Sequence, residues 1–596
     1  MIYKLERLLE KEDKEIVELV YDCLDKAEKN QRPYLERFKR YYELYRNYIA
    51  EENKREHGAN LFIPYTFEAV ETIAPRLVTA IFNNRPYMTA VPLSNTAYEN
   101  ARNMEMLLDY QAEKYLDPVL FFTMVFKNAL KYGTSIVKTT WKFTEKTIRV
   151  NKYEKNPKLS ALMQRKVETE KVVTYNAPYM EIVPLEDFFF DPSASDLESA
   201  RFVIHRYYED IDIIKEKVED GIYKAKEEDI EKLSDESFHY SENTFTSAQR
   251  VDGVTGGDSK PEGMVEILEF WGDDCVIKVA GDIILDIDYN PFFHGERPFV
   301  RFLDYPVANE FYGIGEVEVI ESLQEELNTT RSQRLDNVTM VINNMWKVVR
   351  NSNIDPNQLI SRPNGIVEVE DPNDLTPLTV PDVTEAGYKE EQIIKDDIDR
   401  TTGVNDYTRG GNPARRETAT TASLLSESAN ERFKLKIRLL EKTSFKQVGY
   451  QLVALNQQFI TEDVEVRLFD KTKPMEQNYT NPETVKLSPQ DIAGQFDLIP
   501  CGSTTEPLAN KELRQTQITQ LYNTMGQSEY INQPEFLTAI LEAFDFKNVD
   551  KLILQQPPMP EQPIAGMEGM MPEGVEGGGP LPEEAVMQDP YFQNMQ

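Results

Sequence analysis

The sequence predicts an α+β protein of several domains, and three observations lead to that prediction. Long helical runs occupy both ends of the chain, whereas residues 134–302 alternate apolar and polar side chains over short stretches, as half-buried antiparallel strands do. The helical part from 311 to 459 is interrupted twice, first by an insert rich in Pro, Asn and Asp and then by a loop rich in Gly and Arg. With 596 residues, 40% of them hydrophobic, the chain can bury more than one core.

The net charge of −36 and the cysteine count of three limit the classes of function. A protein that holds nucleic-acid phosphates normally needs a basic surface, so this chain repels DNA unless a local basic patch overrides the field. The acidity equally suits a protein that only has to stay soluble. Cys23, Cys275 and Cys501 are far apart, which argues against a disulfide framework or zinc site and favours a reducing compartment. No signal peptide and no run of about 18 apolar residues occurs, so we expect neither secretion nor a membrane span.

The first half of the chain is predicted to begin with helices and to continue with strands. Residues 1–57 have the pattern of charged amphipathic helices, with an interruption near Pro33 because proline lacks the backbone N–H that a helix needs. The next elements expected are a helix over 64–82, an extended segment over 85–92 and one helix over 95–132 that Gly133 ends. Strands are expected over 135–143, 171–175, 264–271 and 275–279, a charged helix over 210–233, and a surface loop over 241–262.

The second half is predicted to contain three long helices. They run from Gly315 to Lys347, from the end of the insert to Arg400, and from Ala419 to Phe459. In the last of these, apolar residues such as Phe433 and Leu440 lie along one face, and Lys436 is placed with the other basic residues on the remaining faces. Strands over 464–469 and 496–500, helices over 509–554 and an acidic tail without Lys or Arg follow; we expect the tail to be disordered.

Known catalytic and metal-binding patterns are absent from the sequence. The segment 253–260 lacks the spacing of a phosphate-binding loop, and 191–202 resembles a calcium loop but has no Gly at its sixth position and Phe202 at its twelfth. A turn or a helix N-cap is the alternative at Asp191. The four histidines, His57, His205, His239 and His294, are widely separated and are interpreted as ordinary core or surface residues. We therefore predict that the protein is not an enzyme and needs no cofactor and no metal.

Several segments resemble the portal (head-to-tail connector) proteins of tailed bacteriophages, in particular the podovirus-like portal family. Tyr312-Gly-Ile-Gly-Glu316 and its continuation to Asn337, with the preceding 290–299, resemble the entry into that family's channel-lining stem helix. The stretch Gly403-Val-Asn-Asp-Tyr-Thr-Arg-Gly410, followed by 418–425, is similar to its tunnel loop and long wing helix. Leu185-Glu-Asp-Phe-Phe-Phe-Asp-Pro192 and 200–205 resemble a further segment common in these proteins.

The resemblance implies a multi-domain portal fold with a mixed wing, a long helical stem, a small β-containing clip and a helical crown, assembled as a ring. The order of elements matches nearly the whole chain. The expected domains are an N-terminal helical segment over 1–60, the wing over 61–312, the stem helix over 313–347, the clip over 348–383, the return stem helix over 384–402, the tunnel loop over 403–418, the long wing helix and β return over 419–505, a short crown over 506–555 and a disordered acidic tail over 556–596.

The resemblance also implies which residues form the functional parts of the tunnel loop, the stem and the clip. In the tunnel loop these are Arg409, Gly410, Gly411, Arg415 and Arg416, whose arginines either touch DNA phosphates or bridge to acidic neighbours between subunits. In the stem they are Gln324, Asn328, Arg331 and Arg334, and in the clip Arg362, Asn364 and Asp371. The clip would meet the packaging terminase and later the tail adaptors; the alternative is a plain solvent-exposed β-hairpin.

The function expected from the resemblance is a non-enzymatic channel at one capsid vertex, through which double-stranded DNA is packaged and ejected. The implied partners are further copies of the chain, typically in a dodecamer, the passing DNA, the large terminase, the major capsid and scaffold proteins, and neck or tail adaptors. The implied location is the virion, with the host cytoplasm during assembly. Twelve copies would carry twelve times −36 formal charges, so DNA would slide past without being held. The alternatives are another structural ring of the connector, or a nucleic-acid-processing motor subunit.

Overall fold

The computed structural model describes the chain up to Pro500 with several gaps. The described residues are 3–50, 53–82, 85–93, 96–155, 163–226, 228–230, 233, 264–343, 345–350, 352, 354–360, 366–369, 371–404, 431–467 and 484–500. All of them belong to one compact unit, residues 1–512. The predictions for the loop over 241–262, the tunnel loop, the helices over 509–554 and the acidic tail lie outside the described residues.

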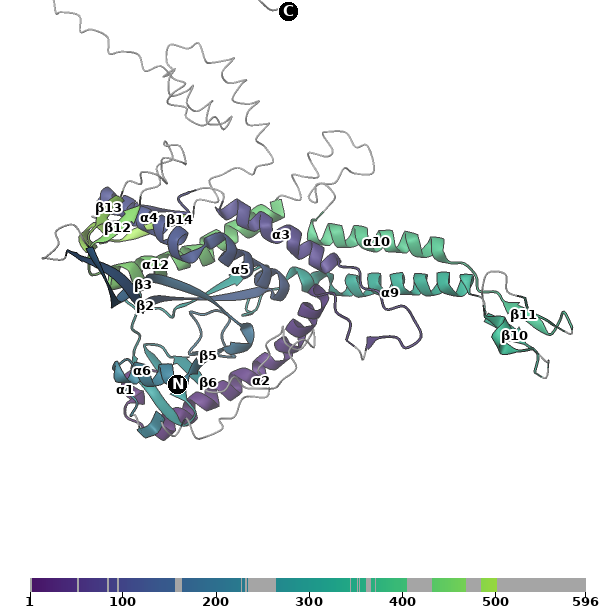
Figure 1. The fold of residues 1–596 in the computed structure, drawn as a ribbon, viewed down its shortest axis with the longest axis horizontal. Coiled ribbons are helices and arrows are strands. Elements are labelled where there is room, and N and C mark those ends of the chain that lie inside the picture. The colour runs from purple at the N-terminus through teal and green to yellow at the C-terminus, as the bar shows by residue number, and fades with distance from the viewer. Residues whose placement is uncertain are drawn as a thin grey trace, which may run out of the picture. The chain divides into compact units, whose positions relative to one another are not determined.

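The two largest sheets of this unit are antiparallel (Figure 1). The first has five strands in the order β4-β5-β6-β7-β8, and the second has three in the order β3-β2-β9. Their bounds are β2 Thr134–Lys155, β3 Met163–Val183, β4 Phe188–Phe190, β5 Val203–Asp210, β6 Met264–Trp271, β7 Cys275–Ala280, β8 Ile283–Tyr289 and β9 Phe299–Leu303. Strands β1 (Met88–Pro92) and β14 (Phe496–Pro500) pair with each other, as do β12 (Val464–Arg467) and β13 (Thr484–Leu487).

The helices share cores with these sheets, which makes the fold the α+β class that the sequence predicts. The helices of this part are α1 Leu5–Leu8, α2 Asp13–Tyr45, α3 Tyr65–Phe82, α4 Tyr98–Gln111, α5 Pro118–Tyr132, α6 Ile211–Glu219 and α12 Lys446–Phe459, the last preceded by helical residues 431–440 and a π-helical turn over Glu441–Phe445. The largest core joins α3, α4, α5 and α12 to β2 and β9, and its centre includes Phe126, Phe302 and Phe445.

The five-stranded sheet is covered on both faces, because alternate side chains of a strand point to opposite faces. On β6, Leu268 and Phe270 pack in a cluster with α1 and the first half of α2. Val265 and Ile267, which precede them on the same strand and point to the other face, pack in a cluster with Ile214 of α6. The helix α2 then continues into the largest core through Phe38. One helix therefore ties the five-stranded sheet to the rest of the unit.

The expected interruption of the first helix near Pro33 is wrong. Helix α2 is 33 residues long, from Asp13 to Tyr45, and it continues past Pro33 without a break. A proline removes one hydrogen bond, and tertiary contacts on the neighbouring turn outweigh that loss. The buried Gln31 amide donates to the Leu185 carbonyl, to the Phe188 carbonyl at 3.0 Å and to the Tyr312 hydroxyl at 3.2 Å.

Two other helix predictions are also wrong in extent. The single helix expected over 95–132 is two helices, α4 and α5, separated at Asp117, which has a left-handed backbone with φ 41° and caps α5 by accepting from the Leu120 amide at 3.4 Å. Pro118 at the first position of α5 favours this new start. The helix expected over 210–233 ends at Glu219, and Gly221 turns the chain with φ 73°.

Strands β2 and β3 are much longer than the runs predicted for them. The alternation of the sequence marked only 135–143 and 171–175, whereas the two strands pair from Ile136 and Val183 out to Lys155 and Met163. The outer part of this hairpin carries polar side chains such as Lys146 and Glu170 on both strands. It lacks the apolar alternation that identifies a half-buried strand. Its two strands pair because they continue the hydrogen-bonded register of the inner, apolar half of the hairpin.

Candidate functional site: the α9–α10 helix pair and its ribbon

Two helices lie side by side and end in a small two-stranded ribbon (Figure 1). Helix α9 spans Glu316–Ile342 and α10 spans Thr384–Thr402. Strands β10 (Met345–Val348) and β11 (Leu375–Leu378) pair antiparallel at the end of the pair. The helix expected from Gly315 to Lys347 is thus shorter, because its last residues form β10. The helix α10 is followed by Gly403, whose φ of 72° is the left-handed conformation that commonly ends helices.

The start of α9 follows a crossing where two glycine-containing segments touch. A Cβ on Gly133 would lie 1.9 Å from the Gly313 carbonyl oxygen, and one on Gly315 would lie 2.7 Å from the Gly133 amide nitrogen. Only glycine allows this approach of backbones. The Tyr312-Gly-Ile-Gly-Glu316 motif is therefore required by packing against the end of α5, and Gly133 is the cap that the sequence predicts there.

The predicted stem residues Gln324 and Asn328 lie at an internal contact of the chain. The buried Gln324 carbonyl accepts from the Thr66 amide and hydroxyl, both at 3.1 Å. Its amide donates to the Ile63 carbonyl at 2.7 Å and to the Asn328 carbonyl oxygen at 2.9 Å. Asn328 also accepts from the Ile63 amide at 3.0 Å. These two side chains hold the segment before and at the start of α3 on α9.

The predicted stem residues Arg331 and Arg334 converge on one carboxylate of α10. The buried Glu391 receives Arg334 at 2.8 Å, Arg331 at 3.1 Å and Lys395 at 2.8 Å. The Arg334 guanidinium also lies over the Tyr388 ring, 3.7 Å from its centroid. Arg334 is buried as well, so this pair is far less screened than a surface ion pair. Glu391 is therefore the centre of the polar contact between the two helices, and its position in the sequence does not mark it out among the many carboxylates of the chain.

A second buried cluster lies where α9 begins. Lys436, from the helical residues 431–440, donates to the Asp304 carboxylate at 2.5 Å and to the Glu316 carboxylate at 2.6 Å. The Tyr305 hydroxyl donates to Glu316 at 3.0 Å, and the Lys436 ammonium lies 3.8 Å from the centre of the Tyr305 ring. The cluster fastens the long helix to the first turn of α9. Lys436 is 5% exposed, so it lies on the buried face with Phe433 and Leu440, three and four positions away, and not on another face as the sequence predicts.

The Lys436 cluster has perturbed pKa values because it is buried. Burial raises the pKa of Asp304 to about 7, while the Lys436 cation opposes that shift. The pKa of Lys436 is raised by the two carboxylates, against the effect of its burial. One oxygen of each carboxylate has no hydrogen-bond partner among the described residues. With both carboxylates ionised, the cluster would carry a net negative charge in a buried place. A proton on Asp304 near neutral pH removes that charge.

Helix α2 braces the solvent side of α9 with ion pairs. Arg37 pairs with Glu318 at 2.5 Å, and Arg40 pairs with Glu321 at 2.5 Å and also with Glu325. Both arginines are about half exposed, so each pair contributes little to stability by itself. Together they link α2 to the first half of α9.

The ribbon exposes apolar side chains that have no core beneath them. All four residues of β10 are exposed, and Trp346 is 38% exposed. Other exposed apolar side chains of the ribbon and its flanks are Ile342, Met345, Val348, Val349, Ile360, Ile366 and Leu378. Of the predicted clip residues, Asp371 caps a turn by accepting from the Asn373 amide at 2.9 Å, whereas Arg362 and Asn364 lie outside the described residues.

The predicted tunnel-loop residues cannot be placed. Arg409, Gly410, Gly411, Arg415 and Arg416 all lie in the stretch 405–430, outside the described residues. The flanks of this stretch are described. Arg432, just after it, donates to the backbone carbonyls of Arg400 and Thr401 at the end of α10. The two ends of the stretch therefore lie close to each other.

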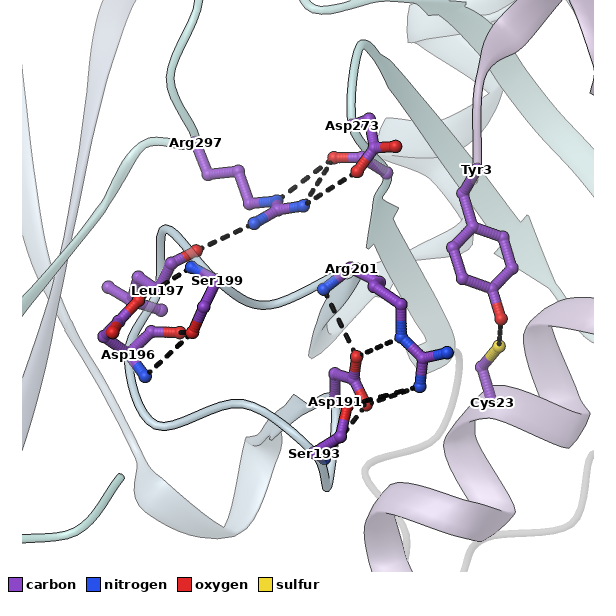
Figure 2. A network of polar contacts seen from close by, with 11 residues as sticks. Tyr3, Cys23, Asp191, Ser193, Asp196, Leu197, Ser199, Arg201, Asp273 and Arg297 are labelled. Atoms are coloured by element: carbon purple, nitrogen blue, oxygen red, sulfur yellow. Dashed lines mark hydrogen bonds and ion pairs between the residues drawn. The ribbon is translucent and has the colours of Figure 1, made fainter. Parts of the chain in front are cut away.

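The calcium-like segment at Asp191 is a turn closed by an arginine (Figure 2). The Asp191 carboxylate accepts from Arg201 at 2.5 and 2.9 Å and from the Ser193 amide at 3.1 Å. These bonds hold the pKa of Asp191 well below its usual range, with the Arg201 bond as the largest cause. A guanidinium already occupies the carboxylate, so the turn interpretation is confirmed. Within the described ranges, no group of three His, Cys, Asp or Glu side chains is arranged to hold a metal.

His205 is an ordinary core residue, as expected. Its ring nitrogen Nδ1 lies 3.2 Å from the Lys138 ammonium, which forms a 2.6 Å ion pair with the buried Glu269. Burial, aided by the nearby Lys138 charge, lowers the pKa of His205. The three residues connect the two sheets. As for membranes, none of the helices in the described part combines the length and apolar character needed to cross a bilayer.

Comparison with known proteins places this chain beside phage portal proteins. The family model described as phage SU10 portal protein matches residues 16–571, nearly the whole chain. Among solved structures, a chain of the neck of an empty GTA particle, computed with C6 symmetry, aligns with 9% sequence identity and a TM-score of 0.34, over 80% of this chain and 90% of that chain. The second similarity is too low to support any argument.

Proposed function

From the premise that the chain belongs to the phage SU10 portal protein family, and is a portal protein, we propose that it forms a ring whose central channel carries double-stranded DNA. The ring sits at one capsid vertex of the virion, is assembled in the host cytoplasm, and contains twelve copies. Its further partners are the large terminase, the major capsid and scaffold proteins, and neck or tail adaptors. Its role is structural: it conducts and docks, and no step of it requires a catalytic group.

The observation that carries this proposal is the α9–α10 pair with its exposed ribbon. Two-stranded ribbons are at best marginally stable in water, and this one exposes Trp346 and Met345 on strands without a core. Copies packed side by side around an axis would cover these side chains. The long helices would then line a channel, and their length would be set by the ring rather than by a single subunit.

Electron microscopy of the purified full chain, with its mass in solution, tests the ring. We expect particles with a central hole and a mass near twelve times 68.9 kDa. Scaffold protein is added in a second sample, because assembly of such rings can depend on it. If the chain stays monomeric or dimeric in both samples, the proposed ring is wrong.

The tunnel-loop arginines are proposed to touch DNA as it passes. The stretch that contains them leaves α10 and returns at Arg432, beside the end of that helix. Arginine supplies sequence-independent phosphate contacts of the kind a conduit needs. In an otherwise acidic ring, a few cations at one level would centre the duplex without holding it.

Replacing Arg409, Arg415 and Arg416 together with Ala is expected to leave ring formation intact and to reduce DNA packaged or retained per particle several-fold. The measurement is the nuclease-protected DNA per capsid in an assembly reaction. Lys434→Ala, an exposed basic residue outside the loop, is the control. Unchanged packaging by intact triple-variant rings would favour the other role, ion pairs with acidic neighbours.

The ribbon is proposed to be the docking surface for the terminase and the neck proteins. A rigid insertion beside Asn364 is expected to abolish binding of these partners, because it would obstruct the outer end of the ribbon, which neighbouring copies in the ring leave accessible. Binding is measured by co-sedimentation with rings, and the control is the same insertion after Gly221, a surface turn far along the chain from the ribbon. Rings that bind both partners normally despite the Asn364 insertion would contradict this role.

A further inference from the structure

A cavity of about 290 Å³ opens between α2, α5 and the ends of β2 and β3. Its walls are largely apolar and aromatic, with Leu35 and Phe38 on one side and Ile182 and Val183 on another. The volume is near the lower end of small-ligand sites in proteins. None of the roles proposed above for this chain uses the cavity.

A buried lysine lies in the wall of this cavity. Lys131, near the end of α5, is 9% exposed. Its ammonium lies over three tyrosine rings, 5.6 Å from the centre of Tyr42, 5.3 Å from Tyr45 and 4.8 Å from Tyr132. Ring faces attract a cation but supply no hydrogen-bond acceptor of carboxylate strength.

Two carboxylates, Glu71 and Glu186, act on Lys131 through space without an ion pair to it, and Glu186 lies in the cavity wall. Glu71 forms a 2.7 Å ion pair with Lys127 and accepts the Tyr45 hydroxyl at 2.6 Å. Among the described residues, no carboxylate lies within ion-pair distance of the Lys131 ammonium. Ser135, on the same cavity wall, is buried and its hydroxyl has no hydrogen-bond partner in the described part of the chain. Buried polar groups are rarely left without partners, so the Ser135 hydroxyl points to a ligand, and the Lys131 ammonium, on the same wall and without an ion pair to any described residue, supplies the charge that would attract it.

We propose that this cavity binds a carboxylate carried on a short apolar body, with the carboxylate at Lys131 and Ser135 and the apolar part along the wall that includes Phe38. The ammonium supplies the charge and the serine hydroxyl a hydrogen bond to the same group. The apolar walls account for the rest of the ligand. A free fatty-acid-like molecule and the C-terminal residue of a protein chain share this chemistry.

The charged state of Lys131 supplies a pH test. Burial lowers the pKa of Lys131 to about 8, and the neighbouring Lys127 adds to the effect, so the ammonium loses its proton just above neutral pH. Binding should therefore be present at pH 7 and weaken as the pH rises through 8. The other titratable groups that face Lys131 are Lys39, Tyr42 and Tyr45 from α2, Glu71 from α3, Lys127 and Tyr132 from α5, and Glu186 after β3. None of these is a histidine, so a loss of binding between pH 7 and 9 would report Lys131.

The test is titration calorimetry of the full chain with octanoate, with octan-1-ol as the uncharged probe. We expect octanoate to bind at pH 7 and octanol to bind at least about tenfold more weakly. The variant Lys131→Met should lose octanoate binding by a similar factor. It removes a buried charge at constant volume, so we expect it to fold; Ser135→Val, which narrows the cavity, is the second variant. Lys215→Met, an exposed lysine of α6, is the matched control and should bind octanoate normally.

A pair of leucine-terminated peptides, one with a free C-terminal carboxylate and one amidated, identifies the source of the ligand. Binding of the acid peptide but not of the amide assigns the cavity to a chain terminus, and binding of octanoate alone assigns it to a small molecule. The proposal is overturned if no carboxylate binds, or if Lys131→Met and Ser135→Val both bind octanoate as the unaltered chain does.

Discussion

Replacing Lys436 with Met is expected to destabilise the protein by about 3–5 kcal/mol. The substitution leaves Asp304 and Glu316 buried together with no cation between them, and each already has one oxygen without a hydrogen-bond partner in the described structure. The midpoint of denaturant unfolding, measured at one oligomeric state, should fall accordingly. Lys434→Met, two positions away on the exposed side of the same helix, should change it by no more than about 0.5 kcal/mol.

The pH dependence of the free energy of unfolding distinguishes the contribution of Asp304 from that of Lys436. Asp304 has a pKa of about 7 in the folded chain against 3.8 ordinarily, so it holds its proton preferentially when folded. The free energy of unfolding should therefore fall as the pH rises from about 4 toward 7, and Asp304→Asn should remove this slope. The raised pKa of Lys436 acts in another range: its contribution is complete below its ordinary value of 10.5 and is lost as the pH rises above it. If the Lys436→Met protein is as stable as the Lys434→Met control, the Lys436 cluster does not stabilise the contact between the helical residues 431–440 and the first turn of α9.

Replacing Glu391 with Ala is expected to lower the free energy of unfolding by about 3 kcal/mol and to weaken the packing of α10 on α9. The change leaves the buried Arg334 without its carboxylate, and Arg331 and Lys395 lose the same partner. Amide hydrogen exchange over α10 should become faster, while exchange in the five-stranded sheet should stay as it is. Glu390→Ala, the exposed neighbour on α10, is the control for charge and helix propensity.

The hydrogen-exchange comparison of these two variants also tests the role of Arg331 and Arg334. If amide exchange over α10 is the same in Glu391→Ala and Glu390→Ala, the two helices are held by their apolar cluster, which includes Leu327, Ile394 and Ile398, and the polar cluster adds nothing. If only Glu391→Ala exchanges faster, Arg331 and Arg334 serve to lock the pair. They would then be positioning residues of the channel wall and not groups that meet DNA.

Much of the fold was predictable because apolar periodicity is local. The helix at Thr384–Thr402 and strands β6 and β7 follow directly from side-chain spacing within ten to twenty residues. The errors occurred where that local signal competes with something else. Pro33 stays inside α2 because the nearby Gln31 side chain is hydrogen-bonded to residues that are distant in the sequence. These partners, Leu185 and Tyr312, lie 154 and 281 positions further along the chain. Asp117 divides a run of helical character because a left-handed residue and a proline stand together.

The sequence by itself determined the α+β class, the order of the long helices and the insert between them, and the family resemblance that the family model then established. Gly133 also marked the end of α5, because the requirement for a left-handed residue acts on the backbone locally. Only the tertiary structure decided which charged residues are buried. Lys436, Glu391 and Lys131 look like surface residues in a chain with 28% charged positions. Their partners come from other segments, and burial strengthens a charge interaction that no spacing along the chain reveals.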